Sequence, residues 1–64
     1  MTLTQIKTAV ELGFTVHYGS DAYIVIKDSV GQWLIKCLIN NYCMGLTWTD
    51  GVTMNGDEEK FYIK

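Results

Sequence analysis

The sequence predicts an α+β fold, in which one N-terminal helix packs on an antiparallel β-meander of four to five strands. An apolar pattern at helical spacing opens the chain, and three short apolar runs follow between residues 23 and 49. Turn-forming residues separate these runs, as in consecutive hairpins. The 64 residues, 48% of them hydrophobic, are expected to form a single small α+β domain over residues 1–64.

The helix is expected to begin at Thr2 and end at Gly13. Thr2 and Gln5 have the spacing of a capping box, and glycine readily adopts the positive φ that terminates a helix. Three apolar residues at helical spacing share the predicted buried side: Leu3, Ile6 and Val10. This helix is expected to cover the sheet, and the alternative is a helix that binds a partner.

A first strand is expected over residues 14–18, followed by a turn at Gly19. The next turn is expected at residues 28–31, where Asp28 can accept bonds from the turn backbone. A four-residue turn there places Lys27 opposite Gln32.

The second hairpin is expected to turn at Asn40-Asn41, which tolerate the positive φ of a type I′ turn. This register places Trp33 opposite Trp48 and predicts the apolar face beneath the helix. The predicted face contains Ile24, Ile26, Trp33, Ile35, Cys37, Met44, Leu46 and Trp48. Asp50-Gly51 predicts a further hairpin, which pairs Thr47 with Met54, and residues 61–63 suit a last strand or a strap.

The opposite face of the sheet is unusually apolar for a face exposed to water. In the same register, four of its residues are expected to form an interface: Val25, Leu34, Leu38 and Cys43. We expect a homodimer arranged around a two-fold axis. The alternatives are that residues 61–63 fold over this face or that it binds a ligand.

Polar side chains near that face suggest a site for an anion or a nucleotide, because lysine neutralises phosphate and an aromatic ring stacks on a base. The candidate ligand-binding residues are Tyr23, Lys27, Lys36, Thr47 and His17. The alternative is an ordinary mixed sheet surface.

Charge and motifs narrow the class of function. The formal net charge is −2 and there is no arginine, so nucleic-acid binding is not expected. Cys37 and Cys43 are expected to be free thiols on opposite faces of the sheet, which suits a reducing cytoplasm. No signal peptide, membrane-spanning run, metal motif or catalytic motif is recognisable, so we expect a cytoplasmic protein that is not an enzyme and needs no cofactor.

Four stretches, KDSVGQWLIKC, NNYCMGLTW, DGVTMNG and EEKFYI, resemble a group of small proteins encoded by tailed phages and prophages of enteric bacteria. These stretches contain turn and core residues, so the resemblance implies a setting and no active-site residues. It implies a small phage accessory protein that binds a host protein of defence or regulation. The alternatives are a protein that sequesters a nucleotide signal at a subunit interface and a nucleic-acid-binding regulator.

Overall fold

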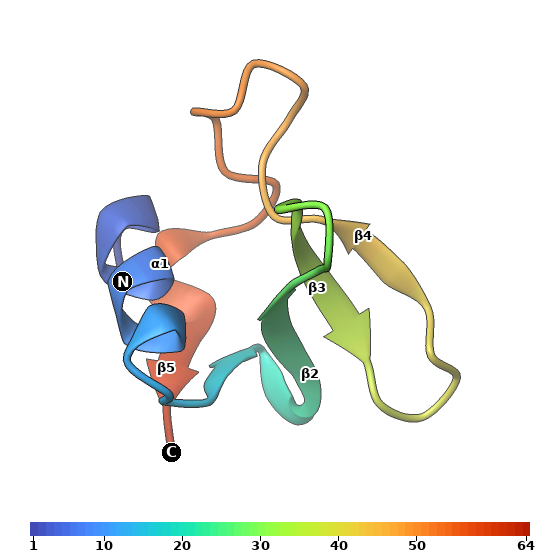
Figure 1. The fold of residues 1–64 in the computed structure, drawn as a ribbon. Coiled ribbons are helices and arrows are strands. Elements are labelled where there is room, and N and C mark those ends of the chain that lie inside the picture. Colours follow the sequence, from blue (N-terminus) through green and yellow to red (C-terminus); the bar gives the residue numbers. More distant parts are fainter.

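The structure, a computed structural model, describes residues 1–64 and confirms the predicted fold class. One helix packs on a five-stranded antiparallel sheet whose strand order is β4-β3-β2-β1-β5 (Figure 1). The elements are α1 (Leu3–Glu11), β1 (Val16–Tyr18), β2 (Ser20–Lys27), β3 (Trp33–Cys37), β4 (Cys43–Gly45), the 3₁₀ helix η1 (Glu58–Lys60) and β5 (Phe61–Ile63). Strands β1 to β4 follow one another in the sheet, whereas β5 returns to the free side of β1.

The predicted capping box is present at the start of α1. The Gln5 amide donates to Thr2 Oγ1 at 3.2 Å, and the Thr2 amide donates to Gln5 Oε1 at 2.9 Å. Both bonds satisfy amides that a helix start leaves without intrahelical partners. Gly13 has a φ of 94° just after the helix, as the sequence predicts.

The core lies between α1 and the adjacent face of the sheet. Its buried residues come from every part of the chain: Ile6, Ala9, Val16, Val25, Ile35, Leu46 and Phe61. Leu3 and Val10 are partly buried against this cluster, so the predicted buried side of the helix is confirmed.

The hairpin between β2 and β3 differs from the prediction by one residue. The Asp28 amide donates to the Gln32 carbonyl at 2.9 Å, which leaves a three-residue loop, and Gly31 has a φ of 87°. Asp28 Oδ1 also accepts the amides of Val30 and Gln32. These bonds stabilise the shorter loop, so Lys27 lies opposite Trp33 and not opposite Gln32.

This shift exchanges the two faces of β2, because side chains alternate along a strand. Val25 lies opposite Ile35 and is 5% exposed in the core. The prediction that Val25 forms an interface on the outer face is therefore wrong. Ile24 and Ile26, predicted to lie beneath the helix, share the opposite face with Leu34 and are half-buried.

The hairpin between β3 and β4 is shifted by two residues. The Cys37 amide donates to the Tyr42 carbonyl at 2.7 Å, and Asn41 has the positive φ, 59°, in the loop between them. A shift of two residues preserves the faces, so Met44 still lies opposite a core residue, Ile35. Leu38 belongs to the loop and is exposed, so its predicted place on a strand is wrong.

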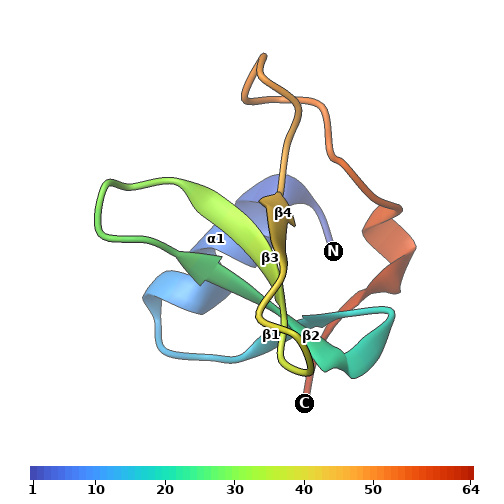
Figure 2. The ribbon, with the colours of Figure 1, turned by 90° about the vertical axis from the view of Figure 1, so that its right-hand side faces the viewer.

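The chain leaves the sheet after β4 and projects as the loop coloured orange in Figures 1 and 2. Thr47 and Met54 form an isolated bridge, which confirms that predicted pair. No regular strand follows, because Asp50 accepts the amides of Val52 and Thr53 within a tight bend. Trp48 is consequently 63% exposed, and its predicted place in the core is wrong.

The first strand begins two residues later than predicted, whereas the last segment matches one of its two predicted forms. Phe14 precedes β1 and is exposed, and its amide donates to the carbonyl of Ala9 at 3.0 Å. Residues 61–63 form a strand, as one alternative predicted, and pair with β1 at the edge of the sheet. They do not fold over the second face.

Candidate functional site

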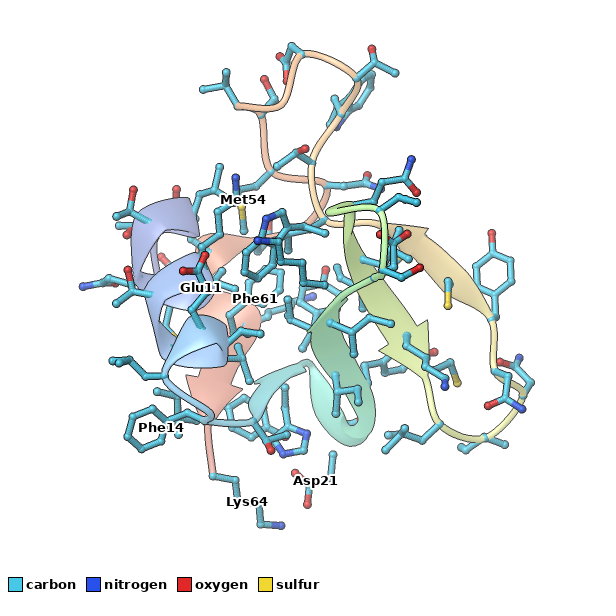
Figure 3. All side chains as sticks on the ribbon, in the orientation of Figure 1. Glu11, Phe14, Asp21, Met54, Phe61 and Lys64 are labelled. Carbon is cyan, nitrogen blue, oxygen red and sulfur yellow. The ribbon has the colours of Figure 1, made fainter.

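A groove of about 660 Å³ lies between α1 and β5 and is the larger of the two pockets in the structure. Its helix side presents Thr4, Thr8 and Leu12, one residue from each turn, and its strand side presents Phe61 and Ile63. Phe14 lies at the end nearest the C-terminus of the helix, and Phe61 points between helix and sheet (Figure 3). We call this feature the α1–β5 groove.

The α1–β5 groove exposes large apolar side chains to water. Leu12 is 71% exposed, Phe14 55% and Ile63 45%. No residue that lines the groove has an ionisable acidic or basic side chain except the weakly acidic Tyr62. Met1 also lines the groove and carries the α-ammonium, which donates to the Glu58 carbonyl. An apolar concavity without charged side chains is typical of a binding site for another molecule.

Strand β5 is an edge strand, because it pairs with β1 on one side and is last in the strand order. Its three residues, Phe61, Tyr62 and Ile63, include no charged side chain and no proline. Natural edge strands are usually protected by charges, prolines or bulges, since their free backbone groups can pair with another chain. β5 is protected only by its shortness, since it has three residues, so one side of the α1–β5 groove is an edge with free backbone groups.

A polar cluster holds β5 on the other face of the sheet. The Tyr62 hydroxyl donates to Asp21 Oδ1 at 2.7 Å, and Lys64 pairs with Asp21 Oδ2. Figure 3 shows Asp21 and Lys64 approaching each other at the lower edge of the molecule. The Tyr62 ring stacks on His17 with the ring centroids 5.3 Å apart. The cluster links β5 to β1 and β2 through side chains as well as backbone.

Both partners of the Asp21–Tyr62 bond have shifted pKa values. The bonds from Lys64 and Tyr62 lower the pKa of Asp21, because both stabilise the carboxylate. The same bond raises the pKa of Tyr62, because the neutral phenol is the donor. Stability from Asp21 is present above its unfolded pKa of about 3.9 and is lost as the pH falls through its lower folded pKa.

We expect Asp21→Asn to lower the melting temperature at about pH 7, and this deficit to be smaller at about pH 2.5, because lowering the pH moves the wild-type Asp21 carboxylate toward its protonated form. Thermal unfolding followed by circular dichroism at the two pH values measures the difference. Asp57→Asn is the matched control, since Asp57 forms only an exposed ion pair with Lys60, 3.8 Å long. An equal deficit at both pH values would show that the carboxylate charge is not responsible.

The structure disperses the residues predicted to bind a ligand. Tyr23 and Lys27 alternate with Ile24 and Ile26 and therefore lie on the helix side of β2. Lys36 lies on the opposite face, in one row with Ile24 and His17. The remaining candidate, Thr47, lies in the bridge beyond β4. The five side chains do not form one site.

The side chain of His17 is packed within the protein and bonded to the backbone, as a residue with a structural role would be. It is 9% exposed, and its Nδ1 lies 3.2 Å from the carbonyl oxygen of Tyr23. A carbonyl can only accept, so Nδ1 carries the hydrogen in this arrangement. The ring is covered on one side by Tyr62. His17 thus packs β5 against the sheet and does not lie in the α1–β5 groove.

Two of the predicted interface residues, Leu34 and Cys43, lie on the second face of the sheet as expected. Leu34 is half-buried and Cys43 is exposed. Cys43 and Cys37 are both free and lie on opposite faces, as predicted.

A second groove, of about 370 Å³, lies near the start of β3. Trp33 and Trp48 both line it, together with Thr47. Two ammonium groups already lie over the Trp33 ring, Lys7 Nζ at 5.7 Å and Lys27 Nζ at 5.5 Å from its centroid. These cation–π contacts connect α1 and β2 to β3.

The comparisons with protein families, with curated proteins and with solved structures find no match to this chain. No helix has the length and apolar character required to cross a membrane. No group of three or more histidine, cysteine, aspartate or glutamate side chains is placed to hold a metal ion. The candidate site is therefore described from the geometry of the α1–β5 groove alone.

The sequence analysis did not identify the α1–β5 groove. Leu12 and Phe14 flank the glycine that ends the helix, where apolar residues outside the core pattern are a weak signal. Ile63 becomes part of the groove only because β5 pairs with β1, which is distant in the sequence.

Proposed function

We propose that this protein acts by binding a protein partner, and that the α1–β5 groove is its binding surface. The observation that supports the proposal is the exposure of Leu12, Phe14 and Ile63 around a groove without charged side chains beside a free edge strand. A monomer seldom keeps large apolar side chains together in water unless another molecule covers them. No catalytic role is proposed, since the groove offers no nucleophile beside a base.

The setting follows from the resemblance to small phage and prophage proteins. In that setting the partner is a host protein of defence or regulation, and binding takes place in the host cytoplasm. A small domain of this kind blocks or redirects its target by covering part of the target's surface. This requires binding affinity but no catalysis. Proteins that act in this way bind through a few buried apolar side chains at the centre of the contact.

We expect the substitutions Leu12→Asp and Phe14→Asp each to weaken partner binding at least about tenfold, because a charge would be buried in the contact. Partners are first captured from a host lysate with the immobilised wild-type protein, and the dissociation constant is then measured with the purified partner. Ile39→Asp is the matched control, since Ile39 is 83% exposed and belongs to the β3–β4 loop, outside the groove.

All three positions are exposed, so unfolding temperatures close to that of the wild type are expected and should be checked first. Equal affinity of the wild type and both groove variants for the captured partner would contradict the proposal. Loss of affinity only in Ile39→Asp would move the binding surface to the β3–β4 loop.

The other functional expectations remain predictions with less support. Nucleotide sequestration was inferred from side chains that the structure places on different faces, and a thermal-shift screen with nucleotides tests it. The homodimer was inferred from an apolar second face, on which Ile24 and Ile26 replace Val25. Sedimentation velocity of the purified chain tests the dimer.

A further inference from the structure

The backbone of β5 offers free hydrogen-bonding groups on its outer side. In an antiparallel pair, residues alternate between those that bond across the pair and those whose backbone groups point away. The Gly19 amide donates to the Lys60 carbonyl at 3.0 Å, whereas the Lys60 amide donates to the Asp57 carbonyl. By the alternation of an antiparallel pair, the Lys60 carbonyl and the backbone groups of Tyr62 point toward β1. Phe61 and Ile63 therefore point theirs outward.

One of these outward groups is already used, because the Phe61 amide donates to the Glu58 carbonyl at the end of η1. The Phe61 carbonyl, the Ile63 amide and the Ile63 carbonyl remain. These are two acceptors and one donor, in the arrangement that an added antiparallel strand requires.

The same two residues also contribute side chains to the α1–β5 groove. Side chains at alternate positions of a strand share a face, so Phe61 and Ile63 both lie on the helix side of β5. A strand added to this edge would direct every second side chain toward the same side, next to Leu12 and Thr8 of α1. One extended segment could therefore pair with the free backbone groups of β5 and place its side chains in the apolar groove.

The size of the groove indicates that its occupant is a single extended segment and not the surface of a folded domain. The helix of nine residues is about 14 Å long, which matches about four residues of an extended strand. A stable interface between two folded copies buries about 800 Å² from each, which is about a fifth of the total surface of 4255 Å². A groove of one helix length and one strand width, on the order of 70 Å², is too small for that.

The residues that line the groove indicate which side chains the bound segment should carry. The Tyr62 phenol is bonded to Asp21 on the other face of the sheet, and the charge among the lining residues is the Met1 α-ammonium, which donates to the Glu58 carbonyl. Away from Met1, a charged residue that enters the groove would lose water without gaining a partner. Apolar side chains at alternate positions would be buried against Leu12, Phe14 and Ile63. The hydroxyls of Thr4 and Thr8 at the rim can bond polar groups that flank the inserted residues.

We propose that the partner contributes an extended, uncharged segment that adds to β5 as a sixth strand and inserts alternate apolar side chains into the α1–β5 groove. This inference rests on the proposed function and specifies the kind of partner. Recognition by strand addition obtains affinity from backbone bonds and specificity from the alternate side chains.

The probe for this proposal is a display library of random linear peptides of about nine residues, selected on the immobilised protein. The selected peptides are expected to have apolar residues at alternate positions and no charge at those positions. In hydrogen exchange followed by NMR, the Ile63 amide is expected to exchange at least about tenfold more slowly when a synthetic selected peptide is added.

A matched pair of variants separates backbone pairing from side-chain contact. Ile63→Pro removes the outward amide while leaving the bonds to β1, and is expected to weaken peptide binding at least about tenfold. Ile63→Val keeps the amide and a branched side chain, and is expected to bind within about twofold of the wild type. Thermal unfolding of Ile63→Pro shows whether the variant is folded, and the exchange measurement on the wild type does not depend on it.

Several results would overturn the strand proposal. The absence of any selected peptide, the selection of peptides without alternation, or an unprotected Ile63 amide in the complex would each do so. If Leu12→Asp nevertheless abolishes binding of the host partner, the proposed function stands and only strand addition fails. A dimer in sedimentation that Ile63→Pro dissociates would identify the occupant as a second copy and would also overturn the proposal.

Discussion

Replacing Val25 with aspartate is expected to unfold the protein, whereas the same change at Ile26 leaves it folded. Val25 is 5% exposed and lies opposite Ile35 beneath the helix, where a carboxylate has no partner. The expected loss is about 4 kcal/mol or more, comparable to the whole stability of a domain of this size, roughly 3–10 kcal/mol. Ile26 is half-buried on the outer face, and its replacement is expected to cost about 1–2 kcal/mol.

Urea unfolding followed by circular dichroism measures both variants, and the dispersion of amide signals in NMR shows whether each is folded. The pair tests the one-residue difference between the expected and observed β2–β3 hairpins. A folded Val25→Asp together with an unfolded Ile26→Asp would mean that the four-residue turn forms in solution and that the faces of β2 are reversed.

Truncation of the two phenylalanines of the chain to alanine is expected to lower the free energy of unfolding by very different amounts. Phe61→Ala should lose about 3–5 kcal/mol, because Phe61 is 3% exposed and its ring lies 4.6 Å from that of Tyr18. Its removal leaves a cavity between α1 and the edge of the sheet. Phe14→Ala should lose less than about 0.5 kcal/mol, because the Phe14 ring is 55% exposed.

Thermal and urea unfolding of the two variants provide the comparison, with partner binding measured on the folded one. Phe14→Ala is expected to bind its partner more weakly while keeping its stability, since the ring lies at the end of the α1–β5 groove. Equal destabilisation by the two substitutions would indicate that Phe14 packs in the core and that the groove is closed in solution.

Local patterns predicted the elements with good accuracy. The capping box of α1, the glycine after it, the three consecutive hairpin-linked strands and the pairing of Thr47 with Met54 are all present. Each depends on residues that are close in the sequence, so periodicity and turn chemistry are sufficient. The register of β2 was missed because both a four-residue and a three-residue loop suit the segment that starts at Asp28, and the observed bonds of its carboxylate favour the shorter loop.

The candidate site was less accessible to sequence analysis than the fold. Tyr23, Lys27 and Lys36 were grouped by a register that is wrong by one residue, and a single step moves a side chain to the other face. Trp48 was placed in the core because the alternation was continued past Gly45, where β4 ends. Its exposure reflects the bend around Asp50, whose carboxylate accepts several bonds from the loop itself.

The amino-acid sequence by itself determined the class of fold, the position of the helix and the three hairpin-linked strands β2 to β4, because these depend on contacts between neighbours along the chain. Only the tertiary structure decided which face of β2 is buried and that β5 lies beside β1 at the edge of the sheet. Packing between distant segments makes that choice together with the Asp28 bonds in the loop, since one residue of slip would expose Val25 and bury Ile24 and Ile26. The α1–β5 groove exists because of the same long-range pairing.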